Sequence, residues 1–377
     1  MFRSRAVADG HVAGIETQRS KEDGVNSQSN NFVEPVATPI FFSERRVDER
    51  PVQPAREELA DVSILACVDD TPASAAVVLH AIAVGRGLDL PLTLARVVET
   101  APQFGRPADP VEWQLRRNEH RDQLSRMAAF PSGNAWPTRS VLLTGLAADQ
   151  LSDWAAEHRI PLLALATHGH SMPRQSGLGS TAQRILERSS TSLLLVPPSA
   201  MAAREEIIYR KVLVPLDGSC RAESVLPLAS RIARAHGAEI VLAHVVPKTD
   251  VVDSRNGRAS DLSARLMAQN ERRAREYLDE LRGKLRGDGL PVSAIISVNG
   301  DARAELRRLA IQQHIDLIVL SSHGQSGLTD VPCGSVTEYL ATHAPTPMLI
   351  VRPNFIHGFG ASAAVTMPAI ESGPLPN

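Results

Sequence analysis

The chain has 377 residues, with 40 Lys and Arg against 42 Asp and Glu, so its formal net charge is −2. This balance gives no general electrostatic reason to expect nucleic acid or a membrane surface as a partner. Three cysteines without metal-ligand spacing, the lack of an apolar run of roughly 18 residues, and the lack of a signal-peptide pattern favour a cytoplasmic protein that does not cross a membrane.

The two ends of the chain are polar and lack helical or strand periodicity. We expect residues 1–58 and 354–377 to be disordered tails, because they offer too little apolar surface to offset the entropy of ordering them. The remaining residues are interpreted as a first domain over 59–198, a linker over 199–208 and a second domain over 209–353.

An internal repeat is the strongest feature of the sequence. When residues 145–196 are shifted by 155 positions they match residues 300–351 without a gap, so that His168 falls on His323 and Gly179 on Gly334. Residues 64–69 match 212–217 at an offset of 148. The repeat therefore predicts two copies of one domain.

Each copy alternates apolar strands with amphipathic helices. In the second copy the predicted strands are residues 211–216, 239–246, 291–298, 315–320 and 348–351, and Asp301 is a predicted helix N-cap. Gly237 is placed to end the first helix. This alternation predicts an α/β fold, with a doubly wound, five-stranded parallel sheet in each of the two tandem domains.

The loop after the fourth strand carries the chemistry that we expect in each copy. It contains Gly169 and then Gly179-Ser180 in the first copy, and Gly324 and then Gly334-Ser335 in the second, with nine residues between the glycines. Glycines allow a close approach of the backbone to an anion, and a helix start offers N–H groups to phosphate oxygens. Ligands of such sheets bind at the carboxyl ends of the strands. Two copies at one offset are a stronger indication than a single match.

These segments together resemble the universal stress protein family. The matching pieces are the strand 212–217 with Gly218-Ser219, the Ser322-His-Gly loop, Gly334-Ser-Val-Thr-Glu-Tyr-Leu, and Ala344-Pro-Thr-Pro-Met-Leu-Ile-Val. The arrangement is similar to the tandem members of that family, and the resemblance implies a Rossmann-like fold. The ATP-binding branch has the signature Gly-x2-Gly-x9-Gly-Ser/Thr, whose first glycine is replaced here by Ala166 and Ser321.

The resemblance implies an adenine nucleotide partner, with ATP as the cofactor; whether Mg²⁺ accompanies it is left open. Asp69 and Asp217 would lie beside the nucleotide, and Val97 and Val245 would meet adenine through backbone groups. The nucleotide-binding residues that we expect are Asp69, Val97, Ala166, His168, Gly169, Gly179 and Ser180 in the first half, and Asp217, Val245, Ser321, His323, Gly324, Gly334 and Ser335 in the second. Pro173 in the first-half loop, and the absence of Ala-Pro-Thr-Pro from the first half, favour the second half.

We interpret the chain as a stress-response sensor or regulator that binds ATP without efficient turnover, since no set of catalytic residues stands out. Two alternatives remain open: a nucleotide-free interaction scaffold, and a slow ATPase or self-phosphorylating protein that would use the hydroxyls of Ser180, Ser219 or Ser335. A thiol at a helix start has a lowered pKa, which makes Cys220 and Cys333 candidates for redox sensing.

We also expect self-association through the last strand of each half. Residues 193–196 and 348–351 would be open sheet edges unless they pair with each other or across a dimer.

Overall fold

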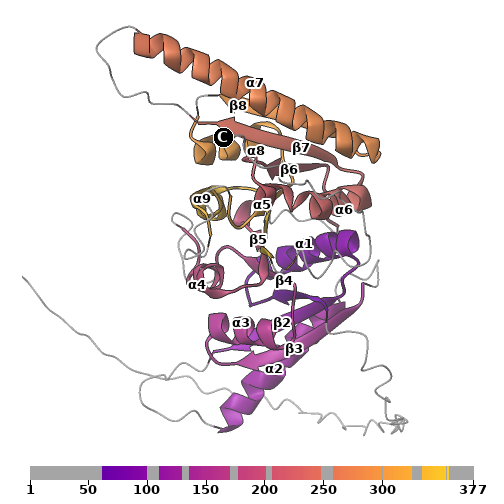
Figure 1. The fold of residues 1–377 in the computed structure, drawn as a ribbon. Coiled ribbons are helices and arrows are strands. Elements are labelled where there is room, and N and C mark those ends of the chain that lie inside the picture. The colour runs from indigo at the N-terminus through magenta and orange to yellow at the C-terminus, as the bar shows by residue number, and fades with distance from the viewer. Residues whose placement is uncertain are drawn as a thin grey trace, which may run out of the picture. The chain divides into compact units, whose positions relative to one another are not determined.

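The computed structural model describes residues 62–99, 110–129, 136–169, 177–200, 206–247, 258–298, 300–324, 333–353 and 355. All of these residues belong to one compact unit, Arg56–Asn377. The terminal tails expected over 1–58 and 354–377 lie outside the described residues, apart from residue 355. Figure 1 shows strands and helices alternating along the described chain.

The first half consists of strands and helices in alternation, as the sequence predicts. They are β1 (Ile64–Cys67), α1 (Ala73–Leu88), β2 (Leu92–Val98), α2 (Pro110–Ala129), β3 (Thr138–Thr144), α3 (Ala147–Glu157), β4 (Leu162–Ala166), α4 (Ser180–Arg188) and β5 (Ser192–Val196). A short 3-10 turn, η1 (Pro198–Ala200), follows β5.

The second half repeats this order with one helix divided in two. Its elements are β6 (Lys211–Pro215), α5 (Cys220–Glu223), α6 (Leu226–His236), β7 (Glu239–Val246), α7 (Arg258–Gly287), β8 (Val292–Val298), α8 (Ala302–Gln312), β9 (Leu317–Ser321), α9 (Ser335–His343) and β10 (Met348–Val351). Gly237 ends α6 with a φ of 64°, and the Asp301 side chain accepts a hydrogen bond from the N–H of Arg303. Both predicted helix boundaries are therefore confirmed.

The ten strands form a single sheet in the order β3-β2-β1-β4-β5-β10-β9-β6-β7-β8. Within each half all neighbouring strands are parallel, which confirms the predicted fold class. Each half has the strand order 3-2-1-4-5, which matches five of the six positions of the Rossmann order 3-2-1-4-5-6. The strands of the two halves run in opposite directions, so their carboxyl ends lie at opposite edges of the sheet.

The two halves are joined by antiparallel pairing of β5 with β10, with Leu194 opposite Leu349. This is the first of the two arrangements expected for the last strands. Each of the two strands already has a neighbour on both sides within the chain. Self-association of two chains through these strands would first have to break the pairing of β5 with β10. The second half of the chain thus provides the strand partner that a second chain could otherwise have provided.

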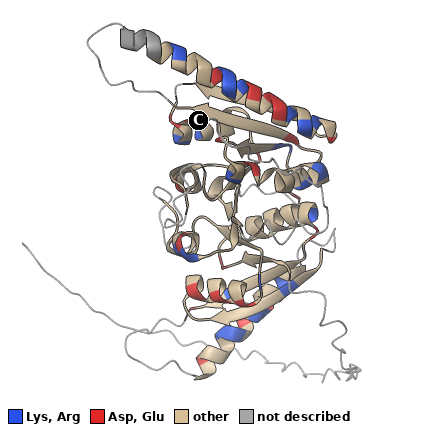
Figure 2. Cartoon of the chain, in the orientation of Figure 1, with Lys and Arg blue, Asp and Glu red and all other residues tan. Residues whose placement is uncertain are grey.

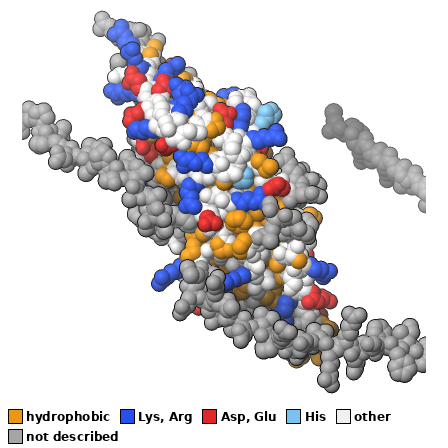
Figure 3. Space-filling model, turned by 90° about the vertical axis from the view of Figure 1, so that its right-hand side faces the viewer, with side chains coloured by type: hydrophobic (Ala, Val, Ile, Leu, Met, Phe, Trp, Pro, Cys, Tyr) orange, Lys and Arg blue, Asp and Glu red, His pale blue; other side chains and the backbone are white. Residues whose placement is uncertain are grey.

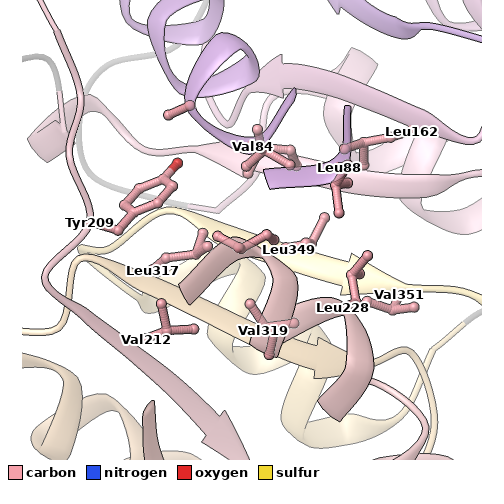
Figure 4. Packing of buried hydrophobic residues seen from close by; sticks show 14 of the residues in the cluster. Val84, Leu88, Leu162, Tyr209, Val212, Leu228, Leu317, Val319, Leu349 and Val351 are labelled. Carbon is pink, nitrogen blue, oxygen red and sulfur yellow. The ribbon is translucent and has the colours of Figure 1, made fainter. Parts of the chain in front are cut away.

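Helices α1 and α6 pack together across the junction of the halves. A methyl group added to Gly87 of α1 would lie 2.7 Å from the Cα of Ile232 in α6, so the two backbones are in close contact. Arg231 donates to the carbonyl oxygen of Leu88 at 2.8 Å. Figure 4 shows aliphatic side chains of both halves in one core here, with the ring of the fully buried Tyr209 at its border.

A histidine in α6 is the reason to expect that this junction is sensitive to pH. His236 lies 2.8 Å, through Nε2, from the carbonyl oxygen of Ala83, and its ring packs on Tyr209. Burial lowers the pKa of His236, despite the opposing effect of that hydrogen bond. The unfolded chain therefore binds the proton more tightly, and stability falls as the pH drops below about 6.5.

We expect the melting temperature to fall between pH 7.5 and pH 5.5, and to fall less in His236→Gln, whose amide can still donate to Ala83. Thermal denaturation at both pH values measures this difference. His343→Gln, at an exposed histidine in α9, is the control and should keep the pH dependence of the unmodified protein. An equal dependence in His236→Gln would show that His236 is not a source of the effect.

The charged run in α7 is a helix face covered by intrahelical ion pairs. Arg275 pairs with Glu271 and Lys284 with Glu280, each one turn apart, and Figure 2 shows the two signs mixed along this helix. On the face in Figure 3 the basic and acidic side chains of the described residues are also interspersed. Among those residues no helix is both long and apolar enough to cross a membrane.

Candidate functional site

All seven first-half residues singled out in the sequence line one cavity of about 400 Å³. The cavity lies where β1, β2 and β4 end and where α4 begins. Asp69 follows β1, Val97 is the penultimate residue of β2, and Ala166 ends β4, followed by His168 and Gly169. Residues 170–176 of the loop lie outside the described residues. The topology of the sheet thus brings together side chains that are about a hundred positions apart.

One end of the cavity is apolar. Ala95 and Val97 of β2 face Leu151 of α3, and Leu165 of β4 completes this part of the wall. The side chains of β2 alternate between the two faces of the sheet, so Ala95 and Val97 share the face that α3 covers. Such a slot suits a flat apolar ring.

The other end is polar and is formed by the start of α4. Gly179 occupies the N-cap position with extended backbone, and its N–H donates to the carbonyl oxygen of Thr167 at 2.8 Å. The amide of Gly179 is therefore used within the protein and is not among the N–H groups that the helix start offers to a ligand. The N–H groups of the first helical turn, from Ser180 onward, have no partner further back in the helix and attract anions.

Asp69 lies between the two ends and is held rigidly. Its Oδ1 accepts hydrogen bonds from the N–H and hydroxyl of Thr71 and from the hydroxyl of Ser74. Its Oδ2 is directed at Gly169, where an added methyl group would lie 3.4 Å away. The carboxylate therefore has a fixed orientation toward the glycine loop before any ligand binds.

A buried arginine contacts the turn after β1, which carries Asp69 and Asp70, from the opposite face of the sheet. Arg96 of β2 is only 4% exposed, forms an ion pair with Asp70, and donates to the side chain of Gln123 in α2 at 2.6 Å. Sequence reasoning missed Arg96, although a single charged residue in an apolar strand was a visible signal. The equivalent position of the second half holds His244, which lies 2.8 Å, through Nδ1, from the carbonyl oxygen of Leu216.

The second half brings its expected residues to the ends of β6, β7 and β9 and the start of α9. The N–H of Gly334 donates to the carbonyl oxygen of Ser322 at 2.7 Å, as Gly179 does to Thr167. Asp217 accepts from the N–H and hydroxyl of Ser219, so that hydroxyl is occupied. The remaining expected residues of this half follow the same pattern: Val245 near the end of β7, and Ser321, His323 and Gly324 at and after the end of β9, with Ser335 opening α9.

The two halves differ in the space between aspartate and glycine. A methyl group added to Gly324 would lie only 2.1 Å from Oδ2 of Asp217, compared with 3.4 Å for the corresponding atoms in the first half. The hydroxyl of Ser321, which replaces the first glycine of the signature, donates to the carbonyl oxygen of His323 at 2.7 Å. Gly324 therefore lies closer to its aspartate than Gly169 does in the first half.

Two of the three cysteines have thiol pKa values shifted away from those expected of redox sensors. Burial raises the pKa of the Cys333 thiol and, more strongly, that of the Cys67 thiol on the cavity wall. A raised thiol pKa lowers the amount of reactive thiolate. For Cys333 the pKa shift is thus opposite to the one expected from the helix start, and its largest cause is desolvation by burial. Cys220 is exposed at the first residue of a four-residue helix.

The fold and the cavity define a tandem α/β protein of Rossmann-like architecture with a ligand-sized site at the strand ends. The chain belongs to the universal stress protein family, whose family model matches residues 63–197 and 208–352. The repeat in the sequence is thus a repeat of this family's domain, and the resemblance seen in the sequence is confirmed.

Individual relatives cover one half or both. A universal stress protein of Methanocaldococcus jannaschii is 26% identical over 157 residues, 39% of this chain and 96% of its own. A solved universal stress protein of Archaeoglobus fulgidus is 15% identical, covers 78% of this chain and 99% of its own, and has a TM-score of 0.53, which shows the shared fold. A solved universal stress protein in complex with cAMP is 22% identical, covers 38% of this chain and 98% of its own, and has a TM-score of 0.28.

Proposed function

We propose that the protein binds ATP or a related adenine nucleotide in the first-half cavity and acts as a stress-response regulator without efficient turnover. The observation that carries this proposal is the cavity itself, which joins an apolar slot at β2 and α3 to the helix start at α4. A volume of about 400 Å³ is in the range of small-molecule sites. The base would occupy the slot, and the phosphates would lie at Gly169 and the first turn of α4.

The described cavity supports the first half, whereas the sequence favoured the second. In the second half Asp217 lies against Gly324, so a ligand that approaches the loop there would have to displace a carboxylate held by Ser219. We propose that the second half serves mainly as the structural partner of the first, through the pairing of β5 with β10. Its last strand, β10, would thereby take the place of a strand from a second chain.

Mg²⁺ would arrive with the triphosphate. Among the described residues no group of three or more His, Cys, Asp or Glu side chains could hold a metal ion. Oδ1 of Asp69 already accepts three hydrogen bonds. Magnesium is commonly held by substrate phosphates with only one or two carboxylates, so the site suits a Mg·ATP complex better than a resident ion.

Isothermal titration calorimetry of the full chain with millimolar Mg·ATP tests the proposal. We expect saturable heat at one nucleotide per chain, and adenine nucleotide in mass spectra of gently purified protein. No heat and no nucleotide would contradict the proposal and favour the scaffold alternative. Phosphate release above that of a binding-deficient variant would favour the slow ATPase.

A further inference from the structure

The order of the strands along the sheet determines how a nucleotide in the first-half cavity would be oriented, with its base at one end and its phosphates at the other. Along the edge of the sheet the strands run β2, β1, β4. The apolar slot lies at β2 and α3, Asp69 follows β1, and the start of α4 lies beyond β4. A nucleotide with phosphates at α4 therefore places its sugar near Asp69 and its base at the end of β2.

The backbone of Val97 faces the position of the base. The N–H of Val68 donates to the carbonyl oxygen of Ala95 at 2.9 Å, so the backbone groups of Ala95 point toward β1. Backbone groups of a strand alternate in direction, so those of Val97 point the same way. β1 ends at Cys67 and Val97 lines the cavity, so we expect the N–H and C=O of Val97 to face the cavity.

Glu99 follows β2 directly and lines the same cavity. Two residues beyond Val97, it continues the face on which Ala95 and Val97 lie. An ionised carboxylate only accepts hydrogen bonds, so it favours a ligand group that donates them. The corresponding residue of the second half, at the offset of 148, is Pro247, which offers no such acceptor.

We infer that Glu99 is a base-specificity residue that recognises the 6-amino group of adenine. Along a strand the C=O of a residue follows its N–H, so the C=O of Val97 lies on the Glu99 side. Adenine that accepts from the N–H and donates its amino group to the C=O turns that amino group toward Glu99. A 6-oxo purine would instead bring an oxygen toward the carboxylate. This inference rests on the proposed nucleotide binding in the first half.

Inosine triphosphate is the matched probe, because it carries the same sugar and phosphates as ATP. It differs from ATP at the 6-position, where an oxygen replaces the amino group, and at N1, which then carries a hydrogen. The change at N1 affects the pairing with Val97 in every variant alike, so the role of Glu99 is measured by comparing variants. We expect the unmodified chain to bind ATP at least about tenfold more tightly than inosine triphosphate, since a wrong pairing leaves polar groups of the site unsatisfied. In Glu99→Gln the side-chain amide can donate to the 6-oxo oxygen. The ratio of the Kd for inosine triphosphate to the Kd for ATP should therefore fall about fivefold or more. Calorimetric titration of the full chain with each Mg·nucleotide gives both ratios.

Pro247→Ala, at the matching position of the second half, is the control and should leave the ratio unchanged. Glu99 is exposed, and a melting curve verifies that Glu99→Gln remains folded. Equal binding of both nucleotides by the unmodified chain, or a ratio unchanged in Glu99→Gln, overturns the role of Glu99 and leaves the proposed function intact. A chain that binds neither nucleotide overturns the proposed function as well.

Discussion

Replacing Gly179 with Asp is expected to abolish ATP binding in the first half, with an affinity loss of about a hundredfold or more, while the fold is retained. The new carboxylate would stand at the N-cap of α4, where the proposal places phosphate oxygens, and would repel them at close range. Asp is at the same time one of the preferred N-cap residues. Gly179 has φ −61° and ψ 153°, a conformation open to any L residue.

Gly179→Asn is the matched control, because it has nearly the same shape and capping ability but no charge. An added methyl group would lie 3.3 Å from the carbonyl oxygen of Thr167, so both variants require the same small shift. Calorimetry should show a much weaker loss for Asn than for Asp, and circular dichroism should show equal folding. Equal losses for the two variants would indicate a steric effect and would remove the evidence for phosphate at this helix start.

Gly334→Asp makes the same change in the second half, where an added methyl group is 3.6 Å from the nearest atom, the carbonyl oxygen of Ser322. If ATP binds in the first half, this variant should retain ATP binding. Loss of binding in Gly334→Asp and not in Gly179→Asp would assign the nucleotide to the second half, as the sequence favoured.

The fold could be predicted almost entirely from the sequence, because the repeat and the strand-helix alternation are local patterns. The pairing of the two halves could be predicted only as one of two alternatives. Two apolar strands, 193–196 and 348–351, needed partners, and the sequence left both a partner within the chain and a partner in a second chain open. In the structure the two strands pair with each other, and α1 and α6 pack closely beside them, where Gly87 meets Ile232. No local pattern encodes that contact.

The gathering of the candidate residues at the strand ends was predictable from the sequence, and their geometry was less so. The glycines and aspartates were found because they recur at a fixed offset. Arg96 and Glu99 were missed because their second-half counterparts, His244 and Pro247, differ, and a repeat reveals only what both copies share. The tighter approach of Asp217 to its glycine in the second half is also absent from the pattern, because it depends on side-chain packing after folding.

Replacing Gly87 with Ala is expected to destabilise the junction of the halves. The added methyl group would lie 2.7 Å from Cα and 3.3 Å from the backbone nitrogen of Ile232, and a backbone cannot move aside as a flexible side chain can. Helices α1 and α6 would have to separate. Overpacking of this kind costs about 1–3 kcal/mol, which exceeds the gain of roughly 0.5–1 kcal/mol that Ala brings to a helix interior.

Gly283→Ala in α7 is the matched control for that change, since it makes the same substitution within a helix but meets no atom within 4 Å. Gly283→Ala should raise the melting temperature slightly, because Ala stabilises a helix relative to Gly. Gly87→Ala should lower the melting temperature by several degrees, at about 2–4 °C per kcal/mol. Thermal denaturation of the two variants under one condition gives the comparison. A stabilised Gly87→Ala chain would mean that α1 and α6 do not approach each other closely, and the junction described above would then lose its main helical contact.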